Sequence, residues 1–261
     1  MISMSDDQVI EQKPLEEAYP DPAYKEMADV GLFYGRKRSK TNPKMRPYIL
    51  GNRNEIEIIN LAKTKEVLEI ALAFLGEKVK VGGQVLLVGT QPAAQGVTDL
   101  AKELNLPLVS NRWIGGTLTN WKVISTRIEY FKKLKADMAS GNLEKYTKKE
   151  RLEFERDIRR YEETMGGLEN MSSLPAIVIV IDTNVHMTTV RETRHLKIPV
   201  IGLMNTDSDP DMVEYPVVGN TKARQSINWF LSKVREAIME STSARARMAE
   251  EAAAKKEVKN S

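Results

Sequence analysis

The chain alternates short apolar runs with amphipathic segments of helical length, and this alternation constrains its fold most. Residues 84–89 and 176–182 enclose continuous apolar runs bounded by turn-forming residues, which is typical of buried strands. Residues 63–78 carry apolar side chains at helical spacing. Strands separated by helices favour a parallel sheet with right-handed crossovers. We therefore predict an α/β fold with a doubly wound, mainly parallel sheet flanked by helices.

The same criteria predict the remaining elements. The predicted strands are 55–59, 84–89, 107–110, 176–182, 199–203 and 215–218, the last of them at a sheet edge. The predicted helices are 23–30, 63–78, 92–105, 186–196 and a closing helix that ends near residue 240. Asn220 is the expected N-cap of the closing helix. The basic segment 36–46 contains Pro43 and has no clear period, so we expect a loop there.

Residues 111–121 mark a change in this pattern. Two adjacent glycines allow backbone angles that other residues avoid, and Thr117 or Thr119 is suited to cap the helix that follows. Two apolar stripes of helical period come next, separated by a Gly-Asn break. Helices of this kind pack as an antiparallel hairpin, so residues 121–166 are predicted to form an inserted coiled-coil arm. The stripes are Trp121, Ile124, Ile128, Phe131, Leu134 and Met138, then Leu152, Phe154, Ile158, Tyr161 and Met165.

These elements divide the chain into four parts. Residues 1–22 are acidic and contain several prolines, so we predict a disordered arm. The α/β domain comprises residues 23–120 and 167–240, and the hairpin is inserted between these two stretches. Residues 241–261 are rich in Ala, Arg, Glu and Lys and lack apolar periodicity. We expect them to form a charged tail that is frayed or disordered.

Charge is unevenly distributed, although the net charge is only +3. Residues 1–31 carry a net charge of −6, whereas residues 32–53 contain seven cations and no acid. Such a run repels itself unless something anionic meets it. The flanking Tyr34 and Tyr48 favour binding of bases or phosphates, and a solvated loop is the alternative interpretation. The candidate nucleic-acid-binding residues are Arg36, Lys37, Arg38, Lys40, Lys44, Arg46 and Arg53.

The composition excludes several classes of site. The chain has no cysteine, which excludes disulfides, thiolate zinc sites and a cysteine nucleophile. The longest apolar runs have six residues, whereas a membrane span needs about 20, so we expect no membrane partner. The acidic start gives no sign of a secretory leader. A protein of the cytosol or of an organelle matrix fits best.

A metal-dependent nucleotide enzyme is the main alternative, because doubly wound sheets bind ligands at the carboxyl ends of their strands. Neither G-x-G-x-x-G nor G-x-x-x-x-G-K-[ST] occurs in the chain. Carboxylates after the strands could hold Mg²⁺, but Asp in such loops more often caps a helix or forms a turn. His186 and His195 have no evident nucleophile partner. We therefore predict no catalytic residue, metal or cofactor. The four candidate carboxylates are Asp182, Asp207, Asp209 and Asp211.

Several stretches resemble one known family. Residues 111–121 are similar to its Arg-Trp-(Leu/Ile)-Gly-Gly-(Thr/Met)-Leu-Thr-Asn segment, and residues 42–49 to its Asn-Pro-Lys-Met-Lys/Arg-Pro-Tyr-Ile segment. Shorter similarities lie at 58–64, 88–93, 174–182, 198–200, 208–210 and 215–220. Over about residues 24–235 the chain thus resembles the bacterial-type small-subunit ribosomal protein two.

The chain departs from the family pattern at three places. Residues 31–36 read Gly-Leu-Phe-Tyr-Gly-Arg where the family usually has Gly-Val-His-Phe-Gly-His. Both histidines are replaced, and Arg36 adds a charge that suits phosphate. Thr41 stands where Trp is usual, which removes a stacking surface. Residues 205–207 read Asn-Thr-Asp where Asp-Thr-Asn is usual, so a site that depends on the first carboxylate would be altered.

The resemblance implies a non-catalytic structural constituent of the small ribosomal subunit that binds 16S-type ribosomal RNA. It adds Arg112 to the candidate RNA-binding residues. The implied partners are small-subunit ribosomal RNA and neighbouring small-subunit proteins, including the large mRNA-binding protein one. The implied location is the ribosome, in the cytoplasm or in an organelle matrix. An RNA-binding regulator outside the ribosome is a third hypothesis.

Overall fold

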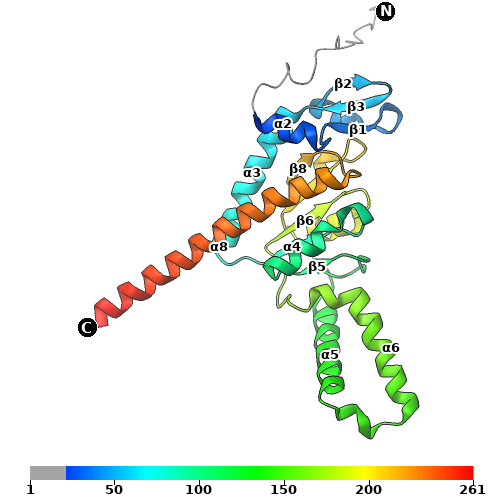
Figure 1. Cartoon of the computed structure of the whole chain (residues 1–261), viewed down its shortest axis with the longest axis vertical. Coiled ribbons are helices and arrows are strands. Elements are labelled where there is room, and N and C mark those ends of the chain that lie inside the picture. Colours follow the sequence, from blue (N-terminus) through cyan, green and yellow to red (C-terminus); the bar gives the residue numbers. More distant parts are fainter. Residues whose placement is uncertain (1–21, 261) are drawn as a thin grey trace, which may run out of the picture.

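A computed structural model describes residues 22–260 and contains two β-sheets (Figure 1). The larger sheet has five parallel strands in the order β5-β4-β6-β7-β8, and the smaller has three antiparallel strands in the order β1-β3-β2. The predicted arm 1–22 lies outside the described residues except for Pro22.

The elements have the following bounds. The smaller sheet consists of β1 (Tyr34–Lys37), β2 (Ile49–Arg53) and β3 (Ile56–Ile59). The larger consists of β4 (Val85–Val88), β5 (Leu108–Val109), β6 (Ile177–Ile181), β7 (Val200–Met204) and β8 (Tyr215–Val218). The α-helices are α2 (Pro22–Asp29), α3 (Leu61–Lys80), α4 (Gly96–Leu104), α5 (Trp121–Ala139), α6 (Lys148–Met165), α7 (Met187–His195) and α8 (Arg224–Asn260).

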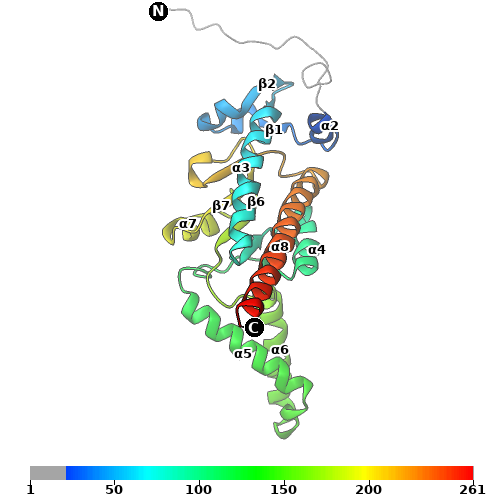
Figure 2. The same cartoon turned by 90° about the vertical axis from the view of Figure 1, so that its left-hand side faces the viewer.

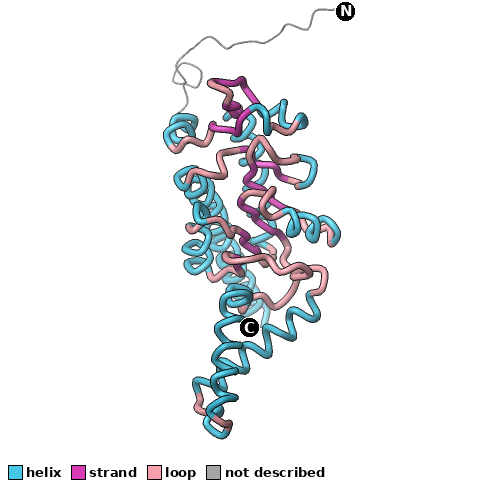
Figure 3. Tube along the Cα trace, turned by 90° about the vertical axis from the view of Figure 1, so that its right-hand side faces the viewer, coloured by secondary structure: helices cyan, strands magenta, loops and turns pink. Residues whose placement is uncertain are grey.

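Helices cover both faces of the parallel sheet (Figure 3). Every residue of β4, β6 and β7 is buried, as expected of parallel strands that are covered on both sides. Along β4, Val85 and Leu87 pack with α3, α4 and α8. Leu86 and Val88 point the other way and pack with α7 and the start of α5. The predicted parallel sheet flanked by helices is confirmed.

The smaller sheet is not apparent from the apolar pattern. Residues 55–59, which were expected to begin the parallel series, contribute β3 and pair with β1 and β2 instead. Asn54 and Glu55 join β2 to β3 and have φ of 50° and 64°, as in the tight turns of β-hairpins. β1 and β2 are mostly polar or charged, so no apolar alternation marks them. Between them lie two 3-10 helices, η1 (Arg38–Lys40) and η2 (Pro43–Tyr48).

The predicted hairpin is present as α5 and α6, at the opposite end of the molecule from the smaller sheet (Figures 1 and 2). Its base is built into the sheet core. Ile124, Ile128 and Met165 belong to the same buried cluster as the residues on that face of β4 and β6. The inner ends of the two apolar stripes therefore anchor the arm to the domain.

The outer part of the hairpin packs on itself. Phe131, Leu134 and Ile158 form a separate buried cluster between α5 and α6. Met138 and Leu152, which belong to the predicted stripes, are 46% and 45% exposed. The two helices thus bury apolar side chains most completely in the middle of the arm, and those nearer its far end are only partly covered.

The closing helix α8 is longer than predicted. It begins at Arg224, so the prediction that Asn220 is its N-cap is wrong. The side chain of Asn220 instead accepts from the N–H groups of Lys222 and Ala223 in the turn before the helix. The helix then continues to Asn260 and extends away from the fold (Figure 1), so residues 241–260 are helical and not irregular. Ala, Glu, Lys and Arg are strong helix formers, so they prolong an established helix without an apolar face. No helix within residues 22–260 is long and apolar enough to cross a membrane.

The two parts of the hairpin should respond differently to deletion. Replacing residues 135–154 with a short Gly-Ser linker keeps the base and should leave a domain that unfolds in one cooperative urea transition. Deleting residues 124–165 removes three buried side chains of the sheet core, each worth about 2–5 kcal/mol. That variant should be much less stable or unfolded. Equal stability of the two variants would contradict the anchoring role of the base.

Candidate nucleic-acid interface

The smaller sheet is attached to the carboxyl ends of β7 and β8. The backbone N–H of Arg36 donates to Thr206 Oγ1 at 2.8 Å, and that of Asn42 donates to the carbonyl oxygen of Thr206 at 2.9 Å. The N–H of Asn220 donates to the carbonyl oxygen of Leu32 at 3.0 Å. Backbone hydrogen bonds from both sides therefore fix the basic segment, residues 32–53, over one end of the parallel sheet.

Two of the predicted RNA-binding cations are engaged by carboxylates of the chain itself. Arg36 Nε lies 3.3 Å from Asp207 Oδ2. Lys44 Nζ lies 2.9 Å from Asp209 Oδ2 and 2.8 Å from Asp211 Oδ2. Hydrogen bonds to Asp211 and Asp209 raise the pKa of Lys44. Arg36 and Lys44 thus join the basic segment to the loop after β7, and each lies beside a carboxylate of the chain itself.

The other cations of the segment face solvent. Lys37, Lys40, Arg46 and Arg53 are exposed, and none of them forms an ion pair within residues 22–260. Arg38 is also exposed, and its backbone N–H donates to the carbonyl oxygen of Glu55 at 2.9 Å. Most, but not all, of the predicted cations are thus accessible on the smaller sheet and the 3-10 helices between its strands. We call the exposed surface of this segment, with Lys37, Arg38, Lys40, Arg46 and Arg53, the basic face.

Arg112 is exposed but lies elsewhere. It follows β5, whereas the basic face is attached to the loop after β7, and β4 and β6 lie between these two strands. At about 4.8 Å per strand, β5 and β7 are roughly 14 Å apart. Arg112 thus stands at the same carboxyl edge as the basic face but is not part of it.

At the crevice where a doubly wound sheet would bind a ligand, side chains of the chain itself bond to one another. This crevice lies between the carboxyl ends of β4 and β6. Lys222 Nζ donates to Asp182 Oδ2 at 2.9 Å and to Gln91 Oε1 at 2.8 Å, and Thr221 Oγ1 donates to the same carboxylate at 3.1 Å. Burial acts to raise the pKa of Asp182, but the hydrogen bonds from Lys222 and Thr221 help to outweigh it, and the pKa is lowered overall.

The four aspartates considered as metal ligands do not come together. Asp182 pairs with Lys222, Asp207 with Arg36, and Asp209 and Asp211 with Lys44. Within the described part of the chain, no group of three or more His, Cys, Asp or Glu is placed to hold a metal ion. Each carboxylate instead meets a cation from a distant segment.

His186 is buried beside this crevice and acts as a hydrogen-bond acceptor. Its Nε2 accepts from the backbone N–H of Thr90 at 3.3 Å. Burial lowers the pKa of His186 to about 4, against the opposing effect of the Asp182 charge. The imidazole is therefore neutral at neutral pH and joins the end of β4 to the start of α7.

Glu192, which the sequence analysis did not single out, holds residues 111–121 in place. Its Oε1 accepts from Trp113 Nε1 at 2.9 Å and from the N–H of Gly116 at 2.8 Å. Its Oε2 accepts from the N–H groups of Leu118 and Thr119 at 3.0 and 3.2 Å. The positive φ of 88° at Gly116 lets the backbone turn around the carboxylate. The loop before α5 is thus wrapped around one buried acid.

This arrangement corrects the predicted role of the two threonines. Neither caps α5, whose N-cap residue Asn120 makes no side-chain capping bond. Thr117 Oγ1 donates back to the carbonyl oxygen of Ile114, and Thr119 Oγ1 donates to Glu192. A mid-helix Glu gives no local sequence signal of this kind, because its partners lie more than 70 residues away in the chain.

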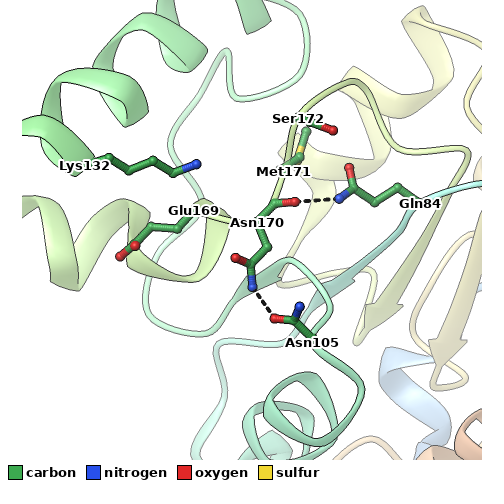
Figure 4. A pocket seen from close by; sticks show the side chains of 7 residues that line it. All are labelled: Gln84, Asn105, Lys132, Glu169, Asn170, Met171 and Ser172. Carbon is green, nitrogen blue, oxygen red and sulfur yellow. Dashed lines mark hydrogen bonds between the residues drawn. The ribbon is translucent and has the colours of Figure 1, made fainter.

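A shallow hollow of about 450 Å³ lies beside the hairpin base, where several segments of the chain meet (Figure 4). Gln84 Nε2 donates to the carbonyl oxygen of Asn170 at 2.7 Å. Asn170 Nδ2 donates to Asn105 Oδ1 at 2.5 Å. These amides fasten the chain after α6 to the segment that enters β4 and to the end of α4. The hollow brings together none of the predicted RNA-binding residues.

Replacing Glu192 with Gln should destabilise the whole domain. An amide has one acceptor oxygen and brings two N–H donors into a site already full of donors, so we expect a loss of about 3 kcal/mol. Burial acts to raise the pKa of Glu192, but hydrogen bonds from Trp113 and the loop backbone lower it overall. Its stabilising effect is therefore complete above the ordinary Glu pKa of about 4.3 and is lost as pH falls through the lower folded value.

Urea unfolding of the wild type and Glu192→Gln between pH 3 and 7 checks this prediction. The difference in unfolding free energy should be largest near neutral pH and should shrink in acid. Glu66→Gln changes an exposed acid on α3 and is the matched control. A pH-independent difference between wild type and Glu192→Gln would show that the charge of Glu192 is unimportant.

Comparison with known proteins places the chain in one family. A model of the family described as Ribosomal protein S2 matches residues 27–241. A relative from Bradyrhizobium diazoefficiens named Small ribosomal subunit protein uS2 is 39% identical over 87% of this chain and 69% of its own length. A relative of the same name from Rhizobium leguminosarum is 37% identical over 85% of this chain and 88% of its own length. Another from Desulfovibrio desulfuricans is 41% identical over 83% of this chain and 84% of its own length.

These matches span the α/β domain, the hairpin and the basic segment, and they confirm the family that the motifs at residues 42–49 and 111–121 predicted. Membership of this family also confirms the expected structural role and not the alternative of a metal-dependent nucleotide enzyme. The chain belongs to the ribosomal protein S2 family and is a structural, non-catalytic protein of the small ribosomal subunit.

Proposed function

We propose that this protein binds 16S-type ribosomal RNA through its basic face, within ribosomes of the cytoplasm. The observation that carries the proposal is the set of exposed cations on the smaller sheet and its 3-10 helices, which have no acidic partner in the described residues. RNA phosphates supply the missing negative charge, and neutralising them requires no reading of base sequence. The cations without an acidic partner are Lys37, Lys40, Arg46 and Arg53.

In this proposal, Arg36 and Lys44 act through the fold and not through the RNA. They fasten the basic face to the loop that contains Asp207, Asp209 and Asp211. Arg112 is a second, separate RNA contact at the far end of the same sheet edge. Two contact points on one rigid edge would set the orientation of the domain on the RNA.

The proposal extends to protein partners and to the hairpin. The family resemblance supports contacts with neighbouring small-subunit proteins, including the large mRNA-binding protein one. The buried cluster of Phe131, Leu134 and Ile158 between α5 and α6 supports a short antiparallel coiled coil in the middle of the arm.

Sucrose-gradient sedimentation of a native lysate tests whether the protein is part of the small subunit, since it should then co-sediment with small subunits.

Removing the four unpaired cations should weaken RNA binding without unfolding the protein. In the variant with Lys37, Lys40, Arg46 and Arg53 all changed to Gln, the slope of log Kd against log salt should fall by about one per lost phosphate contact. Filter binding to small-subunit ribosomal RNA over a range of KCl concentrations measures the slope. The control carries Lys80, Lys102, Arg191 and Arg247 changed to Gln, an equal loss of exposed charge on α3, α4, α7 and α8.

The control should keep the wild-type slope, because its four cations lie on helices outside the basic segment. If both variants lost slope equally, binding would depend on net charge alone. If neither lost any, the basic face would not be the RNA contact.

Lys44 and Lys40 should separate the structural role from the binding role. Lys44→Gln removes the two ion pairs to Asp209 and Asp211, so it should lower the urea midpoint and leave the salt slope unchanged. Lys40→Gln should do the reverse, because Lys40 is exposed and has no ion pair in the described residues. A reduced slope in Lys44→Gln at unchanged stability would show that Lys44 leaves its carboxylates to bind phosphate.

A further inference from the structure

The strand pairing of the smaller sheet places an aromatic ring and two unpaired cations on one face. Ile58 of β3 pairs with Tyr34 of β1 on one side and with Gly51 of β2 on the other. Ile56, two residues earlier on the same strand, pairs with Lys37 and with Arg53. Residues paired across strands share a face of the sheet, and so do residues two apart along a strand. Tyr34, Lys37, Gly51 and Arg53 therefore surround Ile56 and Ile58 on a common face.

An irregularity in β1 is needed for this arrangement. Tyr34 and Lys37 are three residues apart and would point to opposite faces of a regular strand. The register shifts between them, so that three steps along β1 correspond to two along β3. A bulge of this kind re-aims side chains at a sheet edge, and here it brings Lys37 to the face that holds Tyr34.

Tyr34 is placed to receive a planar ligand. Its side chain is 47% exposed. The ring of the buried Phe33 supports it from behind, with ring centroids 4.1 Å apart and planes inclined by 35°. Tyr48, the other tyrosine that flanks the basic segment, is partly buried against the sheet core, and Lys63 Nζ lies 6.0 Å from its ring centroid. Only Tyr34 of this pair presents an accessible ring.

We propose that Tyr34 stacks on an unpaired base of the bound RNA, while Lys37 and Arg53 hold the phosphates on either side of it. An exposed aromatic ring on a sheet face between cations is the arrangement by which single-stranded RNA is bound without a fixed sequence. Gly51, opposite Tyr34 across β3, has no side chain to cover the base. This inference rests on the proposed RNA binding and deepens it, since it assigns a single-stranded segment, and not a duplex, to the basic face.

The test uses the full chain and a short single-stranded RNA of mixed sequence that carries one 2-aminopurine, a base whose fluorescence falls when it stacks. Tyr34→Leu should weaken binding by about fivefold or more, the smallest loss expected for one stacked base. It should also reduce the fluorescence change on binding and leave the salt slope unaltered, because no phosphate contact is lost. Tyr34→Phe keeps the ring and should behave as the wild type.

Tyr130→Leu is the matched control, because Tyr130 is 46% exposed and lies on α5 in the hairpin. It should bind as the wild type does. Circular dichroism and urea unfolding of each variant verify that the fold is retained.

The outcomes distinguish the two proposals. Wild-type binding by Tyr34→Leu, together with weakened binding by the variant that lacks the four cations, would overturn the stacking role and leave RNA binding by the basic face intact. Wild-type binding by both variants would overturn the proposed function as well. A loss in Tyr34→Leu that Tyr34→Phe does not rescue would assign the effect to the hydroxyl group and also reject stacking.

Discussion

Buried and half-buried carboxylates are unfavourable unless their lone pairs are met by donors or cations, and this requirement organises the carboxyl edge of the parallel sheet. Glu192 on α7 is met by the loop before α5, and Asp182 after β6 by Lys222 before α8. The half-buried Asp209 after β7 is met by Lys44 of the N-terminal segment. Each acid thereby joins the sheet to a different part of the chain.

The same contacts explain how a sheet of a ligand-binding type serves a structural purpose. In an enzyme of this architecture, the crevice at the switch in strand order would be open to substrate. Here Lys222 and Thr221 both donate to Asp182, and Lys222 also donates to Gln91. The loops that would carry catalytic groups instead carry attachments to the smaller sheet and to the hairpin. The architecture is retained, and its ligand site is occupied by the protein itself.

The sequence predicts best those elements whose signal is local and apolar. Apolar patterns in the sequence predict the buried strands β4, β6 and β7 and the two hairpin helices. Burial requires apolar side chains at these positions, so the pattern is visible in the sequence. β1 and β2 escape such prediction, since they lack apolar alternation and are held by pairing with β3 and by contacts with the distant loop after β7. The positive charge of residues 32–53 is equally visible in the sequence. That Lys44 is neutralised while Lys40 is not depends on a contact 165 residues away, which no local pattern reports.

The attachment of the basic segment at Arg36, Asn42 and Lys44 has a consequence for how tightly a polyanion can be held there. A flexible basic tail must lose conformational entropy when it binds, and this loss is subtracted from its affinity. The segment in this protein is ordered by its own fold before any partner arrives. If the proposed RNA contact is correct, little of the attraction between unlike charges is spent on ordering the protein.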